Sequence, residues 1–206
     1  MQTEQTERQN AKHKKAMQKQ KAKVDARIQQ AQTERGLVLL LTGNGKGKTS
    51  SGFGMVMRAL GYGQRVGVVQ FIKGAQLSGE EIYLRDHCPQ VAFHQMDTGF
   101  TWDTQDRTAD MAAAQKTWGQ AAQLLAADSP LDLLLLDELT YMLAYKYLDE
   151  AAVLEAIAAR PAEQTVVITG RGGGSALQEL ADTVSEVKEV KHAFKAGLAA
   201  RRGVDF

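Results

Sequence analysis

Short apolar runs alternate along this chain with longer segments that have helical spacing. In the apolar runs most positions are Leu, Val or Ile, a pattern typical of parallel strands covered on both faces. Alternation of such strands with helices predicts an α/β fold with a mostly parallel sheet and helices on both of its faces. We expect strands at 37–41, 65–72, 91–96, 131–136, 165–169 and 183–190. We expect helices at 12–33, 51–60, 80–87, 106–127, 149–160, 177–181 and 192–201, and a loop at 97–105.

A glycine-rich turn follows the first apolar run and leads into a helical segment. This strand–loop–helix context, with Gly-Lys-Thr at the end of the turn, is that of a P-loop, although Thr42 stands where the first glycine usually does. Backbone N–H groups and the helix N-terminus would surround a polyphosphate, and a glycine-rich β-turn is the competing interpretation. We therefore predict a P-loop NTPase-like domain over residues 36–206. Its predicted nucleotide-binding residues are Gly43, Asn44, Gly45, Lys46, Gly47, Lys48, Thr49 and Ser50.

Two carboxylates end the fourth apolar run. Asp137 and Glu138 follow four leucines, as in a Walker B element, and a carboxylate there could hold Mg²⁺ or Mn²⁺ opposite the hydroxyl of Thr49. The alternative is that Asp137 only caps the next helix. Spacing alone leaves open which of the two carboxylates is the inner metal ligand.

Other candidates lie on loops beyond the strand ends. Phe100 and Trp102 alternate within a loop, either as core side chains beneath it or as an apolar wall for a flat, bulky substrate. Arg171 either neutralises phosphate charge or forms a surface ion pair. Arg58 lies one helical face along from Thr49 and is a further candidate near the nucleotide. His192 is interpreted as a residue at a helix start.

Composition argues against a disulfide-stabilised protein and against a membrane-spanning one. The net charge of +1 gives no overall drive toward nucleic acid or membrane, and Cys88 is the only cysteine, which excludes a disulfide framework. No apolar run has the roughly 20 residues of a membrane span, so we expect a cytoplasmic protein without a membrane partner.

The first 35 residues form a basic arm. Lysines and arginines there outnumber acidic residues by more than two to one, and the arm has neither Gly nor Pro before Gly36. Met17, Val24 and Ile28 share one helical stripe, but such a helix buries little by itself. Three interpretations stay open: a solvated tail, a helix laid over a site or a partner subunit, and a nucleic-acid-binding arm.

Five motifs in this order resemble the P-loop type of ATP:corrinoid adenosyltransferase. They are 42–49 (TGNGKGKT), 68–74 (VVQFIKG), 98–102 (TGFTW), 136–141 (LDELTY) and 168–172 (ITGRG), and the likeness extends from the arm to the C-terminus. The resemblance implies transfer of the 5′-deoxyadenosyl group of ATP to the cobalt of a reduced corrinoid, with release of tripolyphosphate.

The resemblance also implies roles for particular residues. Lys48 would bind the triphosphate. Thr49 and Glu138 would hold the metal ion. Phe100 and Trp102 would pack against the lower face of the corrinoid. It further implies a homodimer, an electron donor such as a reduced flavoprotein, and an arm that serves as a candidate active-site lid.

Two alternative functions follow from the residues themselves. A P-loop phosphotransferase or ATPase would release ADP. A nucleotide-gated nucleic-acid-binding module would use the basic arm, but no aromatic residue stands among the lysines of the arm to stack on bases, so we expect no nucleic-acid partner.

Overall fold

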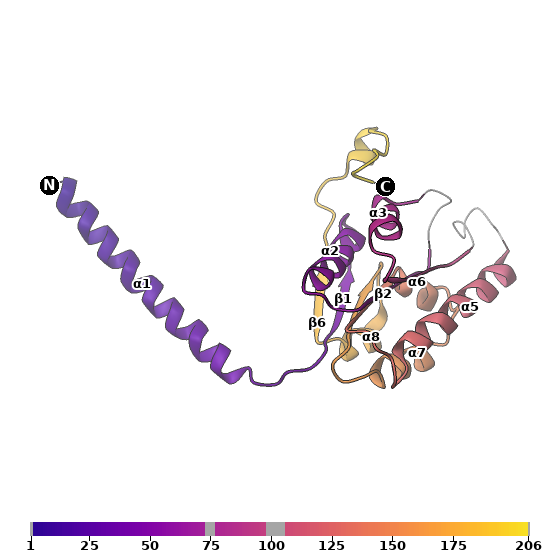
Figure 1. The fold of residues 1–206 in the computed structure, drawn as a ribbon. Coiled ribbons are helices and arrows are strands. Elements are labelled where there is room, and N and C mark those ends of the chain that lie inside the picture. The colour runs from indigo at the N-terminus through magenta and orange to yellow at the C-terminus, as the bar shows by residue number, and fades with distance from the viewer. Residues whose placement is uncertain (1, 73–76, 98–105, 206) are drawn as a thin grey trace. The chain divides into compact units, whose positions relative to one another are not determined.

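The computed structural model describes residues 2–72, 77–97 and 106–205, and Figure 1 shows their elements. The chain divides into two units, Met1–Glu34 and Arg35–Phe206. The first unit carries one helix, α1 (Gln2–Gln30), which begins ten residues earlier than the sequence pattern predicts. Met17, Val24 and Ile28 on this helix are exposed, as expected of a helix that buries little by itself.

The second unit is built on a six-stranded sheet in which every pairing is parallel. Its strand order is β3-β2-β4-β5-β1-β6. The central strands β2 and β4 are buried at every position, which explains why they carry no polar side chain before their last residues, Gln70 and Asp137. The predicted fold class is therefore confirmed. The strands are β1 (Val38–Thr42), β2 (Val66–Gln70), β3 (Ala92–Gln95), β4 (Leu133–Asp137), β5 (Thr165–Thr169) and β6 (Thr183–Glu186).

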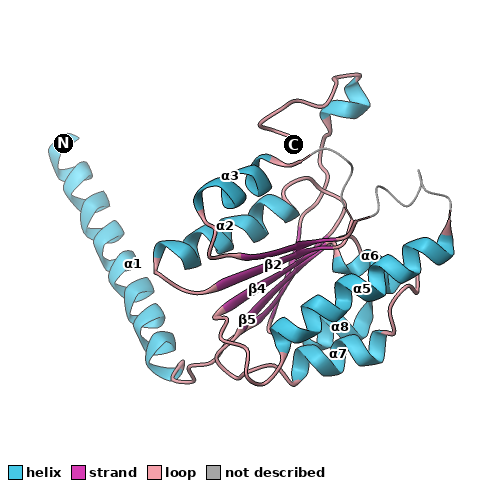
Figure 2. Ribbon diagram, turned by 45° about the vertical axis from the view of Figure 1, so that its right-hand side comes forward, coloured by secondary structure: helices cyan, strands magenta, loops and turns pink. Residues whose placement is uncertain are grey.

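Helices cover both faces of the sheet, and each face has its own apolar core. Figure 2 shows α2 (Lys48–Gly61) and α3 (Gly79–His87) on one face of the sheet. The other face carries α5 (Arg107–Leu125), α6 (Leu139–Ala144), α7 (Glu150–Ala158) and α8 (Gly174–Leu180). Phe53 and Val56 of α2 and Leu84 of α3 belong to the first core. The second core lies under α5, α6, α7 and α8.

Side-chain caps fix where several helices begin. Ser78 accepts a hydrogen bond from the backbone N–H of Glu81, Asp106 from those of Thr108 and Ala109, and Asp149 from that of Ala152. Each cap satisfies N–H groups that have no partner within the first helical turn. These boundaries lie within two residues of the predicted ones.

The C-terminal segment departs most from the prediction. The helix expected at 192–201 is wrong: only Ala193–Ala196 form a 3₁₀ turn (η1), which ends at Gly197 with φ 78°. Phe194 and Leu198 are exposed, so no buried apolar face holds a longer helix. Strand β6 also ends four residues earlier than predicted, at Glu186, because the chain then turns toward the loop after β1.

Helix α6 was not predicted. It has only six residues and begins directly after Glu138, whose backbone is left-handed with φ 60°. Across the described ranges, we find no helix long and apolar enough to cross a bilayer.

Candidate active site

The loop between β1 and α2 is held closely by the segment that follows β6. Gly43 and Gly47 have φ of 99° and 119°, in the left-handed region that favours glycine. A Cβ on Gly45 would lie 2.7 Å from the carbonyl carbon of Lys188, and the N–H of Gly45 donates to the carbonyl of Val187 at 2.7 Å. Any side chain at Gly45 would therefore displace the backbone of that segment. We call residues 43–47 the glycine loop.

The two lysines of this region have different environments. Lys48, the first residue of α2, is buried, and its Nζ donates to the carbonyl of Gly45 at 2.9 Å. Burial lowers the pKa of Lys48, the negative charge of Glu138 raises it, and Arg171 lowers it further. Lys46 is half-exposed and forms a 2.9 Å ion pair with Asp205. The buried ammonium of Lys48 is thus fixed at the centre of the loop, whereas Lys46 lies at its rim.

The adjacent carboxylates Asp137 and Glu138 have different surroundings. Asp137 is fully buried and accepts hydrogen bonds from Thr169 Oγ1 at 2.6 Å and Gln70 Nε2 at 2.9 Å, which belong to the strands on either side of β4. Glu138 lines the pocket described below, and its N–H donates to Thr169 Oγ1 at 3.0 Å. Asp137 therefore connects β4 to β2 and β5 through side-chain hydrogen bonds, while Glu138 lines the pocket.

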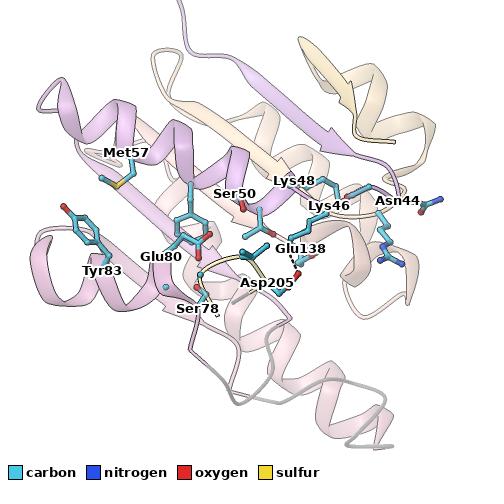
Figure 3. A pocket seen from close by; sticks show the side chains of 18 of the residues that line it. Asn44, Lys46, Lys48, Ser50, Met57, Ser78, Glu80, Tyr83, Glu138 and Asp205 are labelled. Carbon is cyan, nitrogen blue, oxygen red and sulfur yellow. Dashed lines mark hydrogen bonds and ion pairs between the residues drawn. The ribbon is translucent and has the colours of Figure 1, made fainter. Parts of the chain in front are cut away.

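A cavity of about 730 Å³ opens over the glycine loop. Figure 3 shows Asn44, Lys46 and Lys48 toward one end of it, and Met57 of α2 with Tyr83 of α3 at the other. The cavity thus has a cationic end and an apolar end. The predicted site residues that line it are Asn44, Gly45, Lys46, Gly47, Lys48, Thr49, Ser50, Glu138 and Arg171.

Three predicted residues do not line this cavity. Gly43 lies against the backbone of Val187, Asp137 is buried within the sheet, and Arg58 lies in the last turn of α2. Phe100 and Trp102 fall outside the described residues. His192 was interpreted as a helix-start residue; its Nδ1 accepts from the N–H of Phe194 at 3.2 Å, at the start of η1, and it also lines the cavity.

Sequence reasoning missed part of the cavity wall. The missed residues come from α2, α3, α6 and the C-terminal tail, which tertiary packing brings together. No spacing signal connects these segments, although the LDELTY motif contains Tyr141. The missed residues are Phe53, Met57, Ser78, Gly79, Glu80, Tyr83, Leu84, Tyr141, Gly203, Val204 and Asp205.

A family model described as ATP:corrinoid adenosyltransferase BtuR/CobO/CobP matches residues 34–206. The chain belongs to the ATP:corrinoid adenosyltransferase family. The corrinoid adenosyltransferase of Escherichia coli (strain K12) is 56% identical over 189 residues, which cover 92% of this chain and 95% of that protein. The one from Pseudomonas aeruginosa (strain PAO1) is 55% identical over 194 residues, covering 94% and 95% of the two chains. That of a Sinorhizobium species is 40% identical over 202 residues, covering 97% and 94%.

Membership in the adenosyltransferase family confirms the resemblance seen in the five motifs. It identifies the protein as an enzyme of this type, and it favours neither the phosphotransferase nor the nucleic-acid-binding alternative. The match begins at residue 34, so it includes the whole of the second unit and almost none of the arm.

Proposed function

We propose that the protein transfers the 5′-deoxyadenosyl group of ATP to the cobalt of a reduced corrinoid. The bond between the 5′-carbon and its phosphate oxygen breaks, a cobalt–carbon bond forms with the electron pair of Co(I), and tripolyphosphate leaves. The observation that carries the proposal is the buried Lys48 ammonium, which is hydrogen-bonded to the glycine loop and lines one cavity with Glu138, in a chain of this family.

The residues of the glycine loop would stabilise the leaving group. Negative charge grows on the oxygen that departs from the 5′-carbon, and fixed cations are worth most where such charge develops. Lys48 is already positioned by its hydrogen bond to Gly45, so little reorganisation is needed when the triphosphate binds. Because the corrinoid supplies the nucleophile, the reaction needs no general base from the protein.

Thr49 and Glu138 would hold a magnesium ion. Both line the cavity, and hydroxyl and carboxylate oxygens are donors that Mg²⁺ prefers. In the described ranges no three His, Cys, Asp or Glu residues gather as a metal cluster, which fits an ion that takes its other ligands from phosphate and water. Bound there, Mg²⁺ would neutralise charge on the triphosphate. Mn²⁺ offers the same chemistry.

The corrinoid side of the site rests on the resemblance. Phe100 and Trp102 would lie against the lower face of the corrinoid, where apolar rings exclude water and a lower axial ligand. The basic arm, residues 1–35, would cover the site as a lid in a homodimer. An electron donor such as a reduced flavoprotein would supply Co(I), and we place these reactions in the cytoplasm.

Product analysis tests this function directly. The protein is incubated with ATP, Mg²⁺ and chemically reduced corrinoid, and the products are separated by chromatography. We expect adenosylated corrinoid and tripolyphosphate in equal amounts. ADP as the nucleotide product would instead identify a phosphotransferase or ATPase. Salt-sensitive nucleic-acid binding that is lost on deletion of residues 1–35 would favour the binding module.

A further inference from the structure

The aromatic rings that line the cavity differ in their accessibility. Phe53 is only 3% exposed, so the core encloses its ring. Tyr83 stacks on His87 with ring centroids 4.6 Å apart and planes 15° from parallel. Tyr141, on α6, is half-buried and reaches the cavity beside Glu138 and Arg171.

Several contacts fix the position of Tyr141. Its neighbours Leu139, Thr140 and Met142 are fully buried, and Thr140 Oγ1 donates to the carbonyl of Arg171 at 2.8 Å. The ring of Tyr145 lies 5.8 Å from that of Tyr141, at an interplanar angle of 36°. Helix α6 is thus anchored to the end of β5, and a second ring supports Tyr141.

The chemistry of the reaction indicates which part of the cavity holds the junction between the nucleoside and the first phosphate of ATP. The leaving oxygen joins the 5′-carbon to the first phosphate, so the cations that stabilise it should converge at that junction. Lys48, Tyr141 and Arg171 all line the cavity, and Thr140, next to Tyr141, donates to the carbonyl of Arg171. The junction between nucleoside and phosphate therefore fits best in the part of the cavity that Tyr141 borders.

We propose that Tyr141 is the aromatic platform for the nucleoside of ATP, which holds the ribose and its 5′-carbon open to the corrinoid. This inference rests on the proposed function. A purine ring is flat and stacks favourably on a phenol ring, and the Tyr141–Tyr145 contact limits the freedom of that platform before ATP binds. Tyr141 is then a binding and positioning residue and takes no part in proton transfer.

The other end of the cavity is the rival location. Tyr83 and Met57 lie there together with Glu80, as Figure 3 shows. One face of Tyr83 is already covered by His87, and the Glu80 carboxylate beside it would repel the phosphates next to the nucleoside. We therefore assign the nucleoside to Tyr141 and use Tyr83 to test the assignment.

Calorimetric titration of ATP and of tripolyphosphate separates these possibilities. For Tyr141→Ala, we expect the Kd of ATP to rise roughly tenfold, within the range known for a base on an aromatic side chain, and the Kd of tripolyphosphate to stay unchanged. Tyr141→Phe keeps the ring and should stay within about twofold of the parent for both ligands. Tyr62→Ala is the matched control, because Tyr62 is 83% exposed and lies outside the cavity.

Three results would overturn the inference: equal weakening of both ligands by Tyr141→Ala, no weakening of either, or a selective loss for ATP in Tyr83→Ala instead. Equal weakening would mean that the ring only supports the fold, which a thermal melt of Tyr141→Ala would also detect. Failure of the proposed function would look different. The parent protein would then form no tripolyphosphate from ATP and corrinoid, whatever the two titrations give.

Discussion

Lys46 of the glycine loop is paired with Asp205 of the C-terminal tail at 2.9 Å, although the two residues lie far apart in the sequence. The other oxygen of Asp205 accepts from the backbone N–H of Arg201 at 2.8 Å, and these two contacts keep the pKa of Asp205 below its usual value. The tail thus brings a fixed negative charge to the cationic end of the nucleotide cavity, where Figure 3 shows the pair.

Removal of this charge should strengthen phosphate binding. In Asp205→Asn, Lys46 no longer has a carboxylate partner and is available to the triphosphate, so we expect the Kd of tripolyphosphate to fall by up to about fivefold, as for an exposed ion pair. Calorimetric titration measures the change. Glu189→Gln is the control, since it removes a second carboxylate–lysine pair of the same segment, with Lys195. Weaker binding by Asp205→Asn would show that the carboxylate supports the nucleotide site.

The sequence predicted those parts of the site that are local in the chain. The glycine loop, Lys48 and Thr49 follow one strand and begin one helix, so their placement depends on neighbouring residues alone. The parallel sheet was predictable because strands buried on both faces must be apolar throughout. Glu138 and Arg171 line the same cavity because the carboxyl ends of neighbouring parallel strands meet at one edge of the sheet.

Features that depend on tertiary packing were not predictable in this way. Spacing could not distinguish Asp137 from Glu138, because the difference arises from Thr169 and Gln70 on two neighbouring strands. The segment 192–201 has helix-compatible residues, but the fold offers it no apolar surface. Helix α6 was not predicted because its six residues make fewer than two helical turns, too few to show a periodic pattern. Burial of Leu139 and Met142 holds it in place.

Lys48 should be the more important of the two lysines for adenosyl transfer. Lys48→Ala removes the buried ammonium at the centre of the glycine loop, and we expect adenosyl transfer to fall by about 10²–10³-fold, the usual effect of losing one fixed donor to developing charge. Lys46→Ala should cost no more than about tenfold, because Lys46 is half-exposed and its charge is screened. Initial rates with reduced corrinoid measure both changes. Equal losses in the two variants would contradict the distinct roles assigned to the two lysines.

Glu138 and Asp137 should respond differently to loss of charge. Glu138→Gln should raise the Mg²⁺ concentration needed for half-maximal activity by at least about tenfold, since even the loss of a group that only supports a metal ligand costs that much, and leave the melting temperature nearly unchanged. Asp137→Asn should destabilise the fold by about 1–3 kcal/mol, because an amide N–H₂ would face the side-chain donors Thr169 or Gln70. Magnesium titrations and urea unfolding distinguish the two effects. If Asp137→Asn instead raised the Mg²⁺ requirement and Glu138→Gln destabilised the fold, Asp137 would be the inner ligand of the magnesium ion.

The pair Arg35–Asp182 should make stability depend on pH. Asp182 accepts from both terminal nitrogens of Arg35 and from the N–H of Val38 at 2.9 Å, and these contacts lower its pKa to about 2. A carboxyl whose pKa is lowered by folding stabilises the fold fully when the pH is above its pKa in the unfolded chain, about 3.9. That stabilisation is lost as the pH falls toward the folded-state pKa of about 2. The pair ties the start of β1 to the start of β6 in this way.

Asp182→Asn should therefore reduce the free energy of unfolding near neutral pH by about 1–2 kcal/mol, a range lowered to allow for screening by solvent. The difference from the parent protein should shrink as the pH falls below about 4, because the parent then loses the same charge. Urea unfolding across this pH range measures it. Asp25→Asn, which removes the exposed pair with Lys21 on α1, should change stability by no more than about 0.5 kcal/mol at any pH. A destabilisation by Asp182→Asn that persists unchanged in acid would mean that Asp182 acts through packing and hydrogen bonding rather than through its charge.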